Sequence, residues 1–185
     1  MYEPQEDSQM LREVVEAFLK KNPKRICADI GTGTGYQGIA MKPYCDLVLC
    51  SDINEDAINC TINAIGKNPE FKVFKSDLFK SYKREWEKKI DVIAFNPPYL
   101  PKEAEELDDI ELTSGDEGVD VTIRFIEESA KFLSEDGCVF FVASSLSNLN
   151  KIHAKLKEKK FSFKIALKKH FFFEDILIYE AKHDL

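Results

Sequence analysis

The residues most indicative of chemistry form a short motif, Asn96-Pro97-Pro98-Tyr99, directly after the apolar run Asp91–Phe95. Consecutive prolines hold the backbone extended, so the motif is expected to form a rigid rim or, more simply, to open a loop. The Asn96 oxygen and a neighbouring backbone carbonyl can accept both hydrogens of one NH2 group, and the Tyr99 ring can lie against the planar group that bears it. The motif predicts a catalytic site for an amide or an exocyclic amine, provided that a donor site lies upstream.

A donor site is indicated by a glycine-rich turn at residues 29–35, which reads Asp-Ile-Gly-Thr-Gly-Thr-Gly. Closely spaced glycines let a ligand approach the backbone, although the spacing differs from the dinucleotide fingerprint. Asp52 ends the next apolar run, 21 residues after Gly31, where an acid that binds ribose hydroxyls is expected. Asp77 follows the third run and either accepts from an adenine amino group or only caps its own turn. Together these residues predict a nucleoside-containing ligand.

Apolar runs alternate with segments of helical period, which is typical of βα units around a mainly parallel sheet. Strands are expected at Arg25–Ile30, Leu47–Asp52, Phe71–Lys75, Asp91–Phe95 and Cys138–Ser144. Helices are expected at Ser8–Lys21, Gln37–Lys42, Glu55–Ile65, Val119–Leu133 and Leu146–Lys159. Two further runs, Phe161–Leu167 and Phe172–Ala181, are spaced to form an antiparallel pair. Ligands of such sheets bind at the carboxyl ends of the strands, where the motifs lie.

Length and composition favour a single domain over residues 1–185, since 44% of the 185 residues are hydrophobic. The acidic start lacks a signal-peptide pattern and no run is long enough to cross a bilayer, so a cytoplasmic protein is expected, with the nucleus also possible. The five cysteines include no C-x-x-C pair and are expected to be reduced and mostly buried. The three histidines lack ligand-like spacing, so no metal site is expected.

The net charge of −7 is concentrated in one segment. Pro101–Gly118 holds eight acidic residues and one basic residue, whereas the rest of the chain has 25 of each and is neutral. Nucleic-acid binding draws on Lys and Arg that neutralise phosphates, so an acidic segment beside Asn96 favours a basic protein substrate. A solvated loop without a partner is the alternative.

The glycine-rich turn, Asp52, the Ser-Asp-Leu-Phe segment Ser76–Phe79 and the Asn-Pro-Pro-Tyr motif, in this order, resemble a class I S-adenosylmethionine-dependent methyltransferase. The opening Tyr2–Ser8, which reads Tyr-Glu-Pro-Gln-Glu-Asp-Ser, is similar to that of HemK-like protein-glutamine methyltransferases of eukaryotes and archaea. The resemblance implies an α/β Rossmann-like fold, with a seven-stranded, mainly parallel sheet in the order 3-2-1-4-5-7-6 and helices on both faces. Because the first strand is expected near residue 25, the resemblance favours the short branch, which lacks an extra N-terminal domain and methylates class I translation release factors.

The resemblance also implies S-adenosyl-L-methionine as the cofactor and a set of residues that bind it. These residues are Ser8, Asp29, Gly31, Gly33, Asp52, Asp77, Leu78 and Asn96. Within the set, Ser8 and Asp29 are expected to hold the methionine part and Asp52 the ribose hydroxyls. Asp77 and the Leu78 backbone are expected to contact adenine.

On the acceptor side, the resemblance implies that Asn96 and Pro97 present the glutamine amide of a Gly-Gly-Gln loop to the methyl group. The chain departs from the family at Thr113–Gly118, where the usual paired glycines are missing. Two alternatives stay open. One is a methyltransferase of adenine or guanine amino groups in nucleic acid, which the same motif suits, and the other is a non-catalytic cofactor-binding scaffold.

The implied sheet order makes the strand Phe71–Lys75 an edge, and its apolar side chains would leave that edge open to pairing. The resemblance implies a small zinc-binding activator protein that covers this edge in a heterodimer. An edge made harmless by Lys72 and Lys75 is the alternative.

Overall fold

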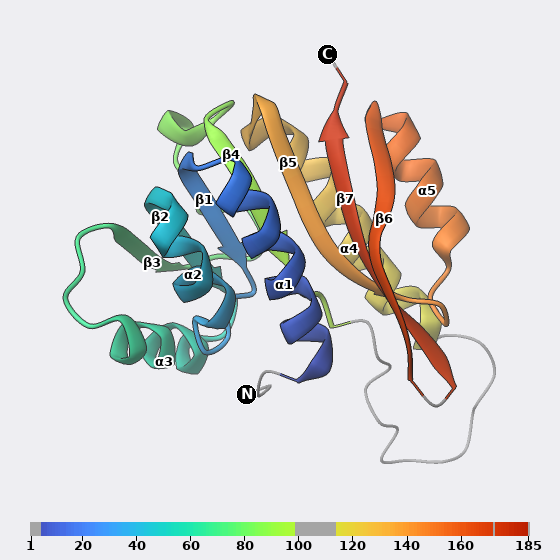
Figure 1. The fold of residues 1–185 in the computed structure, drawn as a ribbon, viewed down its shortest axis with the longest axis horizontal. Coiled ribbons are helices and arrows are strands. Elements are labelled where there is room, and N and C mark those ends of the chain that lie inside the picture. The colour runs from blue at the N-terminus through green and yellow to red at the C-terminus, as the bar shows by residue number, and fades with distance from the viewer. Residues whose placement is uncertain (1–4, 99–113, 172, 185) are drawn as a thin grey trace.

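The computed structural model describes residues 5–98, 114–171 and 173–184, with only the backbone described for residues 114–118 (Figure 1). Within these ranges, seven strands form one sheet in the order β3-β2-β1-β4-β5-β7-β6. The strands are β1 Lys24–Ile30, β2 Cys45–Asp52, β3 Phe71–Lys75, β4 Ile90–Phe95, β5 Leu133–Ser144, β6 Phe161–Phe171 and β7 Glu174–His183. The helices are α1 Glu6–Lys21, α2 Tyr36–Met41, α3 Glu55–Ile65, α4 Ser114–Phe132 and α5 Leu149–Glu158, with short 3₁₀ helices at Lys42–Tyr44 and Arg84–Trp86.

Strands β1 to β5 pair in parallel, and β7 runs antiparallel to both of its neighbours, β5 and β6. This confirms the sheet order and the mainly parallel pairing that the sequence predicted. Because the parallel strands all end at the same edge of the sheet, the segments that follow β1, β2, β3 and β4 meet there.

Both faces of the sheet are covered by helices, which explains the near-continuous apolar runs in the sequence. All six residues of β4 are buried, and the last four, Val92–Phe95, alternate between two cores. Ile93 and Phe95 belong to the core that includes residues of α4 and α5. Val92 and Ala94 belong to the core under α1 and α2, and Figure 1 shows α1 in front of the sheet and α4 behind it.

Several element boundaries differ from the sequence prediction. Helix α5 begins at Leu149 rather than Leu146, because the Asn148 side chain caps it by accepting from the Lys151 amide at 3.2 Å. The β6–β7 turn is much shorter than predicted, since the polar residues Lys168–His170 continue the edge strand β6. No helix within the described ranges is long and apolar enough to cross a membrane.

The expectation that all five cysteines are reduced is wrong for one pair. Cys27 on β1 and Cys45 on β2 form a disulfide, with their Cα atoms 6.3 Å apart. Adjacent parallel strands bring these two side chains into the same core, which a separation of 18 residues along the chain does not indicate. Cys50 and Cys138 are buried thiols, and Cys60 is partly exposed.

Candidate active site

A cavity of about 600 Å³ lies at the carboxyl ends of strands β1 to β4. Its lining includes all the residues expected to bind the cofactor, which are Ser8, Asp29, Gly31, Gly33, Asp52, Asp77, Leu78 and Asn96. Pro97 and Pro98 line it as well, whereas Tyr99 and the segment 101–113 lie outside the described residues. The structure therefore brings to one cavity motifs that are distributed from α1 to the end of β4.

Two glycines of the turn between β1 and α2 combine a left-handed backbone with a close neighbouring side chain. Gly31 and Gly35 have φ angles of 64° and 83°, in the left-handed region. A Cβ atom on Gly31 would lie 3.3 Å from the Phe95 ring, and one on Gly35 would lie 3.2 Å from the Thr61 methyl group. Thr61 supports the turn from outside by donating its hydroxyl to the Gly33 carbonyl at 3.1 Å. The turn thus presents bare backbone to the cavity.

Asp52, at the end of β2, holds the turn in place. One of its carboxylate oxygens accepts from the Gly33 amide at 3.0 Å, and the other accepts from the Asn54 amide at 2.9 Å. A carboxylate has about four lone-pair sites, so each oxygen can accept a further donor. Asp52 can therefore support the turn and bind ribose hydroxyls at the same time.

Asp29, at the end of β1, is almost completely buried. Its Oδ2 accepts from the Thr32 hydroxyl at 2.7 Å and from the Gly38 amide at 2.9 Å. Burial raises the pKa of Asp29 to about 7, the two hydrogen bonds oppose that rise, and the charge of Asp52 adds to it. The cavity floor therefore contains an acid that titrates near neutral pH.

Asp77 lies between two cations that the sequence analysis did not consider. Arg124 of α4 donates to both carboxylate oxygens, at 2.9 and 3.0 Å, and Lys80 donates to one of them at 2.5 Å. The hydrogen bond from Lys80, with a smaller contribution from Arg124, lowers the pKa of Asp77. Arg124 also lines the cavity, so an adenine amino group at this end would share Asp77 with a guanidinium.

Asn96 is held through its NH2 group. Its Nδ2 donates to the Asp7 carboxylate and to the Ser8 hydroxyl, each at 3.1 Å. Because a carboxylate only accepts, this end of the amide must be the nitrogen, which fixes Oδ1 at the other end. Oδ1 is shielded from solvent and has no hydrogen-bond donor among the described residues. Asn96 is therefore oriented as an acceptor whose donor is missing.

Sequence reasoning missed several residues that line this cavity, among them Asp7, Gln37 and Arg124. Asp7 belongs to the opening motif, but a role was predicted only for its neighbour Ser8. Arg124 follows Asp77 by 47 residues, and nothing in that spacing indicates a pair. Gln37 follows the glycine-rich turn on α2, where a side chain is expected to pack rather than to line a site.

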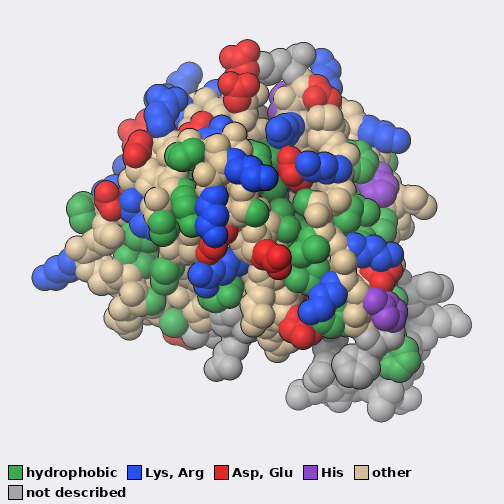
Figure 2. Space-filling view, in the orientation of Figure 1, with side chains coloured by type: hydrophobic (Ala, Val, Ile, Leu, Met, Phe, Trp, Pro, Cys, Tyr) green, Lys and Arg blue, Asp and Glu red, His purple; other side chains and the backbone are tan. Residues whose placement is uncertain are grey.

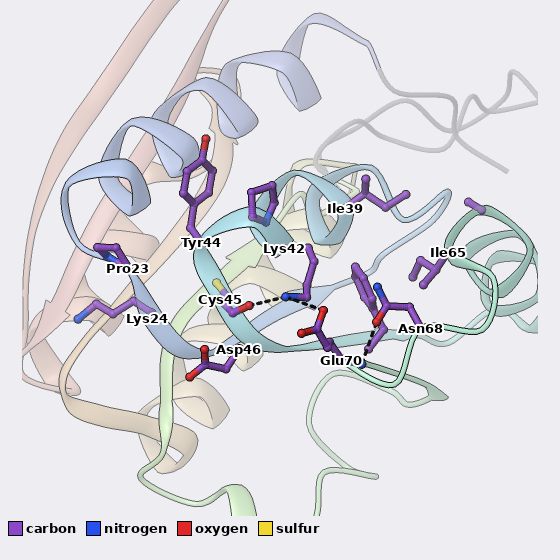
Figure 3. Close-up of a pocket in the computed structure, with 13 residues that line it drawn as sticks. Pro23, Lys24, Ile39, Lys42, Tyr44, Cys45, Asp46, Ile65, Asn68 and Glu70 are labelled. Carbon is purple, nitrogen blue, oxygen red and sulfur yellow. Dashed lines mark hydrogen bonds and ion pairs between the residues drawn. The ribbon is translucent and has the colours of Figure 1, made fainter.

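A second cavity, of about 670 Å³, lies at the opposite ends of the strands, where β1, β2 and β3 begin. Figure 3 shows its main polar group, Lys42, between the Cys45 carbonyl at 2.8 Å and Glu70 at 3.0 Å. None of the predicted catalytic or cofactor residues lines this cavity. No cluster of three or more metal-ligating side chains occurs in the described part of the chain. The cavity beside Asn96 is the candidate active site.

Comparison with known proteins indicates the family of the chain. Residues 7–172 match the methyltransferase small domain family. The chain belongs to this family. Ligands of open α/β sheets bind at the carboxyl edge of the sheet, and the cavity at that edge is the candidate active site of this methyltransferase.

Individual relatives show which kinds of methyltransferase this chain is similar to. A putative protein N5-glutamine methyltransferase of Methanocaldococcus jannaschii is 34% identical, over 98% of this chain and 91% of the relative. The eRF1 methyltransferase catalytic subunit mtq2 of Schizosaccharomyces pombe is 28% identical, over 91% and 83% of the two chains. A solved complex of E. cuniculi Mtq2 with Trm112, responsible for methylation of the eRF1 translation termination factor, contains a chain of the same fold. Its TM-score is 0.74 at 24% identity, over 99% of this methyltransferase and 98% of that chain.

Proposed function

We propose that this methyltransferase transfers a methyl group from S-adenosyl-L-methionine to the glutamine side-chain amide in the Gly-Gly-Gln loop of a class I translation release factor. The observation that carries the proposal is the fixed orientation of Asn96, whose Oδ1 lacks a donor beside a cavity suited to a nucleoside. The relatives named as protein N5-glutamine and eRF1 methyltransferases support the choice of substrate. Because translation takes place in the cytoplasm, we place the enzyme there.

The residues of the cavity fit this cofactor. The glycine-rich turn leaves room where a Cβ on Gly31 would meet the Phe95 ring, and Asp52 retains lone pairs for ribose hydroxyls. In this assignment, Asp77 and the Leu78 backbone hold the adenine, and Ser8 with Asp29 lies at the methionine end. When bound, S-adenosylmethionine supplies an electrophilic methyl group on a sulfonium.

The chain itself positions the acceptor nitrogen. An amide nitrogen is a poor nucleophile because its lone pair is delocalised into the carbonyl. Asn96 Oδ1 and the Pro97 carbonyl would accept its two N–H groups, which concentrates electron density on nitrogen and fixes its direction. Because Oδ1 is shielded from solvent, the substrate NH2 group must displace neighbouring atoms to reach it. The nitrogen would thus be directed toward the methyl group that the bound cofactor would supply, and the proton that the nitrogen loses would pass to solvent.

The substrate assignment is tested by direct competition. The enzyme is incubated with S-adenosylmethionine and release factor, and in parallel with DNA and RNA, and mass spectrometry identifies the product. We expect one methyl group on the loop glutamine and none on a release factor in which alanine replaces that glutamine. Methylation of nucleic acid alone would overturn the proposal.

Charge favours the protein substrate over nucleic acid. The net charge is −7, and basic and acidic side chains are interspersed over the face shown in Figure 2. Nucleic-acid binding needs clustered Lys and Arg that neutralise phosphates. The acidic segment 101–118, which follows the Asn-Pro-Pro-Tyr motif in sequence, suits a basic protein loop.

We also propose that a small zinc-binding protein pairs with the outer edge of β3. Strand β3 is at the end of the sheet order, and the neighbour of the same fold was solved in complex with Trm112. The side chains of Val73 and Phe74 are half-buried against the two cores, so the open part of this edge is its backbone rather than an apolar surface. Active and monomeric protein obtained without a partner would show that none is needed.

A further inference from the structure

A second side-chain amide in the cavity lacks a donor for its oxygen. Gln37, on α2, is 6% exposed, and its Nε2 donates to the Ser8 carbonyl at 2.7 Å. Because a carbonyl only accepts, the NH2 end of the Gln37 amide must face Ser8, and this fixes the position of Oε1. Oε1 is shielded from solvent and has no donor within the described ranges.

The strand order places Gln37 at one end of the bound cofactor. Asp77 follows β3 and Asp52 ends β2, so the adenosine half belongs over that side of the sheet. Gln37 follows β1 and is hydrogen-bonded to Ser8, whose hydroxyl accepts from Asn96 after β4. The amino-acid half of the cofactor must therefore lie at Gln37.

The amino-acid half of S-adenosylmethionine has only one group that donates hydrogen bonds. Its carboxylate only accepts and its sulfonium has no hydrogen-bonding proton, whereas its ammonium carries three N–H donors. We propose that Gln37 Oε1 accepts a hydrogen bond from this ammonium, an inference that rests on the proposed function. The acidic residues Asp7 and Asp29 line the same cavity, which favours a cation there.

The contact needs a small adjustment of the side chain. Oε1 is not open to solvent in the free protein, so the amide must turn about its terminal torsion to meet the ammonium. That torsion has a broad energy profile, unlike the other torsions of the glutamine side chain.

The inference is tested by binding, measured by calorimetry, without a turnover assay. Two ligands are compared, S-adenosylhomocysteine and its analogue without the α-amino group, against the wild type and Gln37→Leu. We expect Gln37→Leu to lower the affinity for S-adenosylhomocysteine by roughly tenfold, because a hydrogen bond to a charged group is lost. Binding of the analogue should not change, so that the preference of the protein for the amino group falls by the same factor.

A control variant separates this role from a purely structural one. Thr61→Val removes the hydroxyl that donates to the Gly33 carbonyl from outside the cavity. This variant should lower the affinity for both ligands by the same factor. If Gln37→Leu lowers the affinity for both ligands by the same factor, Gln37 only links α2 to α1. Unchanged affinity for S-adenosylhomocysteine would also refute the proposed contact. Failure of the wild type to bind S-adenosylhomocysteine would instead overturn the proposed function, and this inference with it.

Discussion

Within the described part of the chain, two buried amide oxygens have no donor, and they belong to Asn96 and Gln37, whose NH2 groups both donate to Ser8. A buried polar group left unpaired costs about 1–3 kcal/mol, so each oxygen lowers the stability of the free protein. Buried groups of this kind are uncommon, and one explanation for them is a catalytic role. At the scale of single residues, these two oxygens are therefore unused acceptors for the proposed substrate and cofactor.

Replacing Asn96 by alanine should separate turnover from cofactor binding. Without Oδ1 the acceptor nitrogen is no longer oriented, and we expect kcat to fall by roughly 10²–10³-fold, the usual cost of removing a preorganised polar contact. Cofactor affinity, measured by calorimetry, should stay within a few-fold of wild type. Asn22→Ala, the same change at the far end of α1, serves as the control, and normal turnover of Asn96→Ala would refute the role of the motif.

Asp29 should make the stability of the cofactor-free protein depend on pH. Its pKa is raised to about 7 in the folded state, so its contribution to the free energy of unfolding is present at low pH and is lost as pH rises from about 4 to 7. The loss is at most about 4 kcal/mol for a shift of about three units. Thr32, Gly38 and Asp52 act on the pKa of Asp29, and the charge of Asp29 in turn raises the pKa values of Cys50 and Tyr82.

The pH dependence is measured by chemical denaturation of the wild type and Asp29→Asn. Other carboxyl groups titrate in both proteins, so the difference between the two curves isolates Asp29. We expect the variant to gain stability relative to wild type as pH rises from about 4 to 7. A difference that is independent of pH would contradict the raised pKa.

The sequence predicted which residues come together at the candidate site, because the rule it used is geometric. Asp52 and Asn96 were predicted to meet because both follow parallel strands, and they do line one cavity. Contacts that depend on side chains from remote elements were not predictable. Two examples are the hydrogen bond from Arg124 to Asp77 and the Cys27–Cys45 disulfide. Predicting either one requires the relative positions of two elements, which neither spacing nor periodicity specifies.

At the scale of elements, β3 is one of the two edge strands of the sheet. The Glu70 carbonyl and the Ser76 amide both bond to β2, at 2.9 and 2.8 Å. Since backbone groups of alternate residues point to opposite sides of a strand, Val73 directs its N–H to the outer edge. This residue offers a way to block pairing at the edge without breaking the sheet.

Val73→Pro should abolish binding of the proposed small partner. Proline removes the outward N–H, and an edge strand tolerates it because no bond to β2 is lost. Val73→Ala loses the same packing but keeps the N–H, so it should still bind. Co-purification of each variant with the partner provides the measurement, and equal binding by both variants would exclude backbone pairing at β3.

At the scale of the whole molecule, charge is distributed unevenly along the chain. The segment 101–118 carries the excess of seven negative charges, and the remainder is neutral. Charges that are exposed act over about one Debye length, which shrinks as salt is added. Added salt should therefore weaken the binding of a basic substrate.

Raising the ionic strength should increase KM for release factor several-fold and leave the cofactor Kd nearly unchanged. A variant with Glu103, Glu105 and Glu106 changed to glutamine should show a higher KM at low salt and a weaker salt dependence. Steady-state kinetics at a series of salt concentrations gives both values. If KM of the wild type does not respond to salt, the acidic segment takes no part in substrate binding.

Ser8 contacts both amides through different atoms, with its carbonyl on Gln37 and its hydroxyl on Asn96. If the two amides hold donor and acceptor, then one residue in the first turn of α1 is common to both ligands. The two binding free energies are then coupled, and linkage requires that each ligand change the affinity of the other by the same factor. Cooperativity between cofactor and substrate would thus originate in a single serine.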